Sequence, residues 1–303
     1  MIIDRLTPTR LNSKSTKYRR LMLRHVSAGG CRYPEACLSS ATAPASPQAP
    51  TQRFHRKYWQ FKYNQSAIYI PYKFRHEYEQ ATDMIYYEKG SPETALSADD
   101  MKKGMVTALN NIGEKYKVLV IPPDYTRLPS RSGELTEYCW EHLGDRITDI
   151  LPALGTHTPM TGEQISHMFG ATPKQLFRVH DWRNDVITLG TVPAEFVKQV
   201  TGGACDFTWP AQVNKLLVEG DFDLILSIGQ VVPHEVVGMA NYNKNIFVGT
   251  GGTEAIHKSH FIGAAYGKER MMGHADTPVR RIFNYASEHF ADKLPIVYVQ
   301  TVV

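Results

Sequence analysis

The chain has 303 residues, of which 42% are hydrophobic and 21% are charged, so it can bury the core of one large domain or two. Its apolar runs all fall short of the roughly 20 residues that a membrane-spanning helix needs, so we expect no membrane partner. Its four cysteines are too few for a disulfide scaffold and lack metal-type spacing, which indicates reduced thiols in a cytoplasmic protein.

The net charge of +4 is unevenly distributed along the chain. Residues 1–57 hold eleven Lys or Arg against two Asp or Glu, a net of about +9, whereas the remainder holds 23 against 28, a net of about −5. Because the main body is mildly acidic, we expect no nucleic-acid partner.

Residues 1–57 begin as a basic segment and become rich in Ser, Ala and Pro, without helical or strand period. This composition predicts a disordered leader. We interpret the leader first as translated text ahead of the true start, next as an organelle transit peptide, and last as a nucleic-acid-binding tail. Whether the native protein carries it stays open.

From Tyr58 the sequence is globular, and strands alternate with helices along it. In chain order we predict a strand over 66–72, a helix over 98–114, a strand over 117–122, a helix over 133–144, a strand over 148–154, a helix after Thr161, a strand over 186–190, helices over 193–200 and 213–218, a strand over 222–229, helices over 254–264 and 279–290, and a strand over 295–300. Ser97 is the expected N-cap of the first helix, and Thr161 with Gln164 fits a capping box. The alternation predicts an α/β fold whose mostly parallel sheet is flanked by helices.

A polar turn, Asp124-Tyr125-Thr126-Arg127, follows the strand over 117–122. Arginine can bind a phosphate or a carboxylate through two parallel hydrogen bonds, and Asp124 is placed to hold the guanidinium of Arg127. On this turn alone, the structural alternative of an ion pair in a surface loop is favoured.

Two histidines also follow predicted strands. His157 lies in Gly155-Thr156-His157, and His234 lies in Pro233-His234 after the apolar strand over 222–229. Ligands bind beyond the carboxyl ends of parallel strands, and imidazole titrates near neutral pH, so both residues are candidates for general acid–base catalysis. Each taken singly is explained more readily as a hydrogen-bonded loop residue, and the polar loop over 180–185 is a further candidate for the lining of a site.

The residues after His234 add an amine and a metal ligand. Lys244 precedes an apolar segment and is a candidate for an activated nucleophile. His257 and His260 share one helical face, and either can bind a metal. The glycine-rich turn over 249–253 offers backbone N–H groups to an anion. Each of these features alone has a commoner structural explanation, as a solvated lysine, unliganded histidines and an ordinary helix start.

The order and spacing of these features resemble the lactate racemase family of nickel-pincer-nucleotide enzymes. The family pattern has Asp-x-Thr-Arg, Gly-Thr-His and Pro-His, then a lysine ten residues after that histidine and another histidine sixteen residues further on. This chain matches the pattern with Asp124, Thr126, Arg127, His157, His234, Lys244 and His260. The resemblance covers about residues 58–303. It implies a Rossmann-like catalytic domain over 58–272 and the beginning of a second, truncated α/β domain over 273–303.

The resemblance also implies a role for each matched residue. Lys244 would tether the pincer nucleotide, a pyridinium mononucleotide whose thioamide and thiocarboxylate groups hold nickel, and His260 would bind that nickel. His157 and His234 would be the two acid/base residues. Asp124, Thr126 and Arg127 would contact the cofactor or the substrate anion. The implied function is a racemase or epimerase of a 2-hydroxy acid that works by reversible hydride transfer and depends on cofactor-biosynthesis proteins.

The segment before the lysine departs from the family pattern. The family has Phe-Ser-Gly-Gly-Arg-Lys, whereas this chain has Met239-Ala240-Asn241-Tyr242-Asn243-Lys244. The bulkier, polar side chains favour a polyhydroxy sugar acid over lactate as the substrate. Two alternatives stay open: a truncated, inactive cofactor-binding remnant, and a metal-independent Schiff-base enzyme centred on Lys244. The identity of the acid and the oligomeric state stay open as well.

Overall fold

The structure is a computed structural model that describes residues 1–5 and 84–302. The predicted strand over 66–72 and almost all of the predicted leader lie outside the described residues. So does the beginning of the domain predicted to start at residue 58. Within the described residues, no helix combines the length and the apolar character needed to cross a membrane. Cys139 and Cys205 are buried free thiols.

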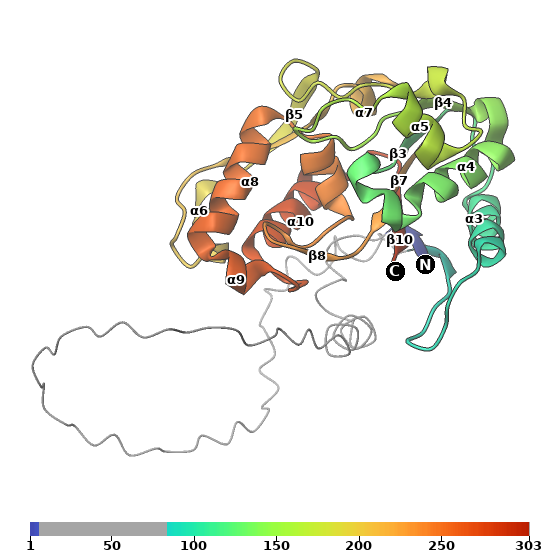
Figure 1. The fold of residues 1–303 in the computed structure, drawn as a ribbon. Coiled ribbons are helices and arrows are strands. Elements are labelled where there is room, and N and C mark those ends of the chain that lie inside the picture. Colours follow the sequence, from blue (N-terminus) through green and yellow to red (C-terminus); the bar gives the residue numbers. More distant parts are fainter. Residues whose placement is uncertain (6–83, 303) are drawn as a thin grey trace, which may run out of the picture. The chain divides into compact units, whose positions relative to one another are not determined.

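A six-stranded sheet forms the centre of the described fold (Figure 1). Its strands follow the order β2 (Met84–Glu88), β1 (Ile2–Arg5), β10 (Ile296–Thr301), β7 (Leu224–Gln230), β3 (Val118–Ile121) and β4 (Ile147–Ile150). Neighbouring strands from β10 to β4 are parallel, whereas β1 is antiparallel to both β10 and β2. The predicted α/β fold with a mostly parallel sheet is confirmed.

Both faces of the sheet are buried, which explains why β3 is apolar along its whole length and why β7 and β10 are largely apolar. Val118 and Val120 of β3 pack with α3 (Ala98–Ile112) and α4 (Ser132–Leu143). Leu119 and Ile121, which point the opposite way, pack with α8 (Thr253–Tyr266) and α10 (Pro278–Phe290). In Figure 1, α3 and α4 accordingly lie on the opposite side of the sheet from α8 and α10.

Shorter elements connect these layers. They are η2 (Tyr125–Ser130), η3 (Gly144–Arg146), α5 (Gly162–Phe169), η4 (Lys174–Leu176), β5 (Val186–Val192), α6 (Ala194–Val200), β6 (Trp209–Asn214), α7 (Leu216–Glu219), β8 (Pro233–His234), β9 (Gly238–Met239), the π-helix η5 (Asn245–Gly249) and α9 (Lys268–Met271). Ser97 caps α3 and Thr161 caps α5, each within a capping box, as the sequence predicts.

The predicted helix over 213–218 is wrong for its first residues. Residues 209–214 form β6, which pairs with β5 in a separate antiparallel sheet, and the helix α7 begins only at Leu216. The side chain of Asn214 accepts a hydrogen bond from the Leu216 N–H at 2.9 Å and so ends the strand beside the first turn of the helix. Pairing with β5 and the burial of Trp209 outweigh the local helical pattern.

The last described residues belong to the same sheet as the rest. The family resemblance implied that residues 273–303 begin a second domain, but β10 lies between β1 and β7 in the sheet. Its residues 296–301 pair in parallel with residues 225–230 of β7. The described part of 273–303 therefore belongs to the first domain, because its strand β10 pairs directly with β7.

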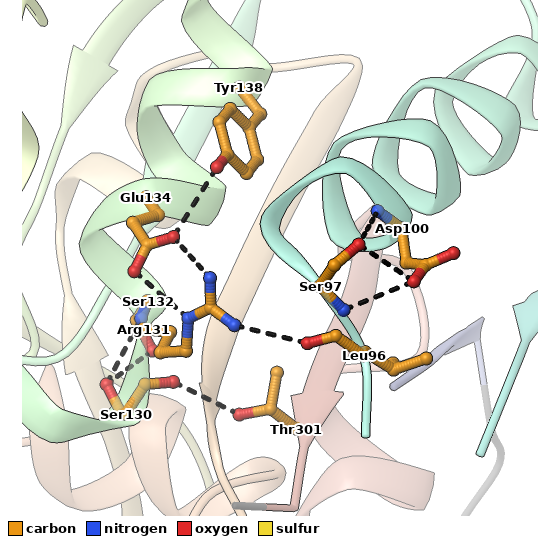
Figure 2. A network of polar contacts seen from close by, with 9 residues as sticks. All are labelled: Leu96, Ser97, Asp100, Ser130, Arg131, Ser132, Glu134, Tyr138 and Thr301. Carbon is orange, nitrogen blue, oxygen red and sulfur yellow. Dashed lines mark hydrogen bonds and ion pairs between the residues drawn. The ribbon is translucent and has the colours of Figure 1, made fainter. Parts of the chain in front are cut away.

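A polar network fixes the turn η2 to the centre of the sheet (Figure 2). The Thr301 hydroxyl of β10 donates to the Ser130 carbonyl at 3.3 Å. Arg131 follows with a φ of 57° and forms two hydrogen bonds with Glu134, at 3.0 and 2.7 Å. It also donates to the Leu96 carbonyl before α3. The end of η2 is thus held by β10, α4 and the segment before α3.

Candidate active site

The polar turns after β3, β4 and β7 open onto one edge of the sheet. These strands are parallel neighbours, so their carboxyl ends lie side by side. They deliver Asp124, His157 and His234, respectively. Gly155 adopts a left-handed φ of 55°, and its N–H donates to the Gly249 carbonyl at 2.8 Å. This turn brings the loop after β4 against η5 and leaves His157 exposed.

One open pocket of about 200 Å³ lies at this edge. All seven residues that the sequence analysis selected line it: Asp124, Thr126, Arg127, His157, His234, Lys244 and His260. The charged side chains of the lining are Arg127 and Lys244, with Asp124 and Glu235 opposing them, so an anionic ligand would bind at the two cations.

His157 and Asp124 form a hydrogen-bonded pair. The Nδ1 atom of His157 lies 2.6 Å from a carboxylate oxygen of Asp124, and the Thr126 hydroxyl donates to the other oxygen at 2.5 Å. The buried carboxylate therefore keeps the proton of neutral His157 on Nδ1 and leaves Nε2 with a lone pair. Among the described residues, no hydrogen bond or ion pair joins the Asp124 carboxylate to the Arg127 guanidinium, and only their backbones are bonded, at 3.0 Å. The expected clamp on the guanidinium is replaced by a clamp on the imidazole.

His234 has the opposite arrangement. Its Nδ1 atom accepts the Val236 N–H at 3.1 Å, so neutral His234 carries its proton on Nε2. Burial, and then the positive charge of Lys244, lower the pKa of His234 to about 4. His234 is therefore neutral at pH 7. The two histidines face the same pocket in different tautomeric forms.

Lys244 is a half-buried amine beside other cations. Burial, and then the charge of Arg127, lower its pKa to about 8. Roughly a tenth of the amine is consequently uncharged and nucleophilic at pH 7, far more than for an ordinary lysine. Lys244 immediately precedes the first residue of η5, so its backbone is fixed at the start of a helical turn.

Arg280 of α10 holds the segment before Lys244 and was missed by the sequence analysis. Its guanidinium is buried, donates to the carbonyl of Met239 and contacts the side-chain oxygen of Asn243. Desolvation lowers the pKa of Arg280 to about 10. No spacing signal marks this residue, since it lies 36 positions beyond Lys244 on an ordinary amphipathic helix.

The tautomer of His260 is suited to metal binding. Its Nδ1–H donates to the Ile256 carbonyl at 2.7 Å, one turn back on α8, so the lone pair of Nε2 is available for a metal. His257, the other predicted candidate, packs against Trp182 with ring centroids 5.8 Å apart and does not line the pocket. In the part of the chain that the structure describes, no three His, Cys, Asp or Glu residues cluster as a metal site. A metal here would need further ligands from a cofactor.

Two other predicted candidates have structural roles. His180 is buried, pairs with the Gly251 carbonyl at 2.9 Å, and accepts the side-chain N–H of Asn214. At the start of α8, the Thr253 N–H donates to the Trp182 carbonyl, and Gln212 accepts the N–H of the third helical residue. These contacts already occupy N–H groups that a phosphate would use, which leaves the glycine-rich turn as a packing feature.

The family model of the lactate racemase N-terminal domain matches residues 103–272, more than half of the chain. This chain belongs to the lactate racemase family. The matched region contains all seven predicted site residues. A curated lactate racemase from Thermoanaerobacterium thermosaccharolyticum is 26% identical over 227 residues, which cover 69% of this chain and 49% of that protein. The chain thus spans about half the length of this family member.

One solved structure supports the same fold. A crystal structure of a Thermotoga maritima protein is 30% identical, with a TM-score of 0.63 over 71% of this chain and 53% of that one. The lactate racemase apoprotein of T. thermosaccharolyticum is 24% identical, with a TM-score of 0.47 over 70% of this chain and 46% of that one.

Proposed function

We propose that this member of the lactate racemase family acts in the racemisation or epimerisation of a 2-hydroxy acid and uses a nickel-pincer nucleotide. The observation that carries the proposal is the convergence of His157, His234, Lys244 and His260 on one pocket. These residues are up to 103 positions apart in the sequence, and each supplies a different chemical property.

The residues present fit this cofactor. Lys244 has the lowered pKa that suits covalent attachment, and His260 directs a free imidazole nitrogen away from its helix carbonyl. A single protein ligand suffices when the nucleotide supplies the other donors. The bound cofactor would supply the group that accepts a hydride from C2 of the substrate.

The protein contributes charge and proton transfer. Arg127 is exposed in the pocket and would bind the substrate carboxylate. Nε2 of His157 would accept the hydroxyl proton, with Asp124 stabilising the imidazolium that forms. His234 would direct its Nε2–H to the substrate oxygen. Nε2 of His234 would act as a base on the opposite face of the substrate only in the other tautomer. That tautomer needs a proton on Nδ1, so Nδ1 must first release the Val236 N–H.

The test is to produce the protein with the cofactor-biosynthesis proteins and to measure nickel, cofactor absorbance and racemisation of a panel of 2-hydroxy acids. Lys244→Ala and His260→Ala should lose nickel, whereas His157→Ala and His234→Ala should keep nickel and lose racemisation. Normal nickel in both of the first two variants would reject the tether and the ligand. A borohydride-trapped adduct on Lys244 without nickel would favour the Schiff-base alternative, and neither cofactor nor turnover would favour the inactive remnant.

A further inference from the structure

Asn241 has an unusual environment in the wall of the pocket. The residue is only 3% exposed, yet neither its Nδ2 nor its Oδ1 atom has a hydrogen-bond partner among the described residues. Leaving a buried donor or acceptor unpaired costs about 1–3 kcal/mol per group. A polar pair left open in the lining of a pocket therefore indicates a ligand that completes it.

The backbone of Asn241 is also held in a conformation that favours glycine. Asn241 and Tyr242 have φ values of 64° and 56°, in the left-handed region that residues other than glycine seldom adopt. Asn tolerates this region better than other side chains do, but glycine adopts it without strain. The chain thus has a carboxamide side chain at a position where glycine would have less backbone strain, three residues before Lys244.

Gly229, at the carboxyl end of β7, provides the room for this carboxamide. A Cβ atom on Gly229 would lie 2.5 Å from Oδ1 of Asn241. Asn245 lies on the same side, but its Nδ2 atom already donates to the Ile228 carbonyl at 3.1 Å. Of these two neighbouring amides, Asn241 is therefore the one left to bind a ligand.

We propose that Asn241 determines substrate specificity by binding a hydroxyl group on the carbon next to the reacting carbon of a polyhydroxy 2-hydroxy acid. A hydroxyl both donates and accepts, so one such group can pair with both Oδ1 and Nδ2. The methyl group of lactate would leave both atoms unpaired, and a carboxylate would leave Oδ1 unpaired. This inference rests on the proposed function and names its substrate class.

The test uses two acids that differ by this one hydroxyl, glycerate and lactate. With the cofactor-loaded protein, kcat/KM should favour glycerate, and Asn241→Gly should reduce the glycerate-to-lactate ratio about tenfold or more. Gly suits a φ of 64°, so this variant should fold. Gly229→Ala, which keeps the carboxamide but displaces it, should reduce the ratio in the same direction. An unchanged ratio in Asn241→Gly would overturn the proposal.

Two further measurements separate this inference from the proposed function. Nickel content should be the same in Asn241→Gly as in the wild type, and loss of nickel would instead assign the carboxamide to a hydroxyl of the cofactor. Calorimetric titration with glycerate and lactate needs no turnover. If no acid is racemised, a preference for glycerate that disappears in Asn241→Gly still supports the role of Asn241, whereas equal binding of the two acids by the wild type rejects it.

Discussion

The Nδ1 atom of His157 lies 2.6 Å from the carboxylate of Asp124, although the two residues follow different strands, 33 positions apart. The contact forms because β3 and β4 are adjacent and parallel. It gives the exposed imidazole a fixed tautomer with Nε2 open to the pocket. Nδ1 of His234 accepts the Val236 N–H, and the Glu235 carboxylate lies 3.8 Å from it, beyond hydrogen-bond distance, so the two histidines differ in the way that their protons are placed.

Asp124→Asn should reduce kcat by about 10²–10⁴-fold, because an amide cannot stabilise the imidazolium and can favour the wrong tautomer. Nickel content should be unchanged, since the substitution affects His157 and not the proposed nickel ligand His260. Asp149→Asn is a suitable control, because Asp149 on β4 pairs with Arg178 and does not line the pocket. Equal kcat in Asp124→Asn and the wild type would separate Asp124 from proton transfer.

His234 should make the protein sensitive to acid. Its pKa is about 4 in the folded state against an ordinary value of 6.5, so the unfolded chain binds more protons between these values. Stability is therefore lost as the pH falls through this window, by about 3 kcal/mol in total. Urea unfolding of His234→Gln from pH 7 to pH 4 should show a flatter dependence than the wild type, and parallel curves would contradict this assignment.

The charged amine of Lys244 should lower the stability of the folded protein, because the environment that lowers its pKa disfavours the charge. Its pKa is about 8 in the folded protein, against an ordinary value of 10.5 that we take for the unfolded chain. The free energy of unfolding therefore rises as the pH increases between these values. Lys244→Met should raise the free energy of unfolding at pH 7 by about 1–3 kcal/mol, and the gain should vanish near pH 10.5. Chemical denaturation of the cofactor-free proteins at the two pH values measures this difference. A destabilised Lys244→Met variant would show that packing, and not charge, dominates at this site.

Arg280 and its neighbour Arg281 offer a matched comparison. Arg280→Met removes the guanidinium that the Met239 carbonyl and Oδ1 of Asn243 contact, and it should cost about 2–4 kcal/mol. It should also reduce nickel loading, because the segment before Lys244 loses its anchor. Arg281→Met breaks an exposed pair with Asp276 and should cost at most about 1 kcal/mol. Similar losses of stability in both variants would refute the anchoring role.

Local signals predicted most of the elements, and non-local contacts account for the errors. The caps Ser97 and Thr161 act on N–H groups three residues away, so the sequence alone identified them. The start of the helix predicted over 213–218 became a strand, because its partner β5 and the burial of Trp209 decide its conformation. The domain assignment of β10 failed for the same reason, since it depends on β7.

In the candidate site, too, local sequence signals predicted some features and only the three-dimensional structure revealed others. Spacing along the chain selected the residues that line the pocket, because each follows a strand or lies on a helix at a recognisable position. Arg280 and the unpartnered carboxamide of Asn241 became visible only in three dimensions. The role of Asp124 also changed, because a sequence cannot show that its carboxylate pairs with a histidine from the loop after the next strand and not with the nearby Arg127.

The central position of β10 has a consequence for biosynthesis. When a ribosome has made the chain only as far as β7, that strand has β3 on one side and an unpaired edge on the other. Exposed strand edges recruit other chains, so a nascent chain is vulnerable to aggregation until residues 296–301 emerge and occupy the gap. The sheet that positions His157 and His234 therefore closes only after residues 296–301 have left the ribosome.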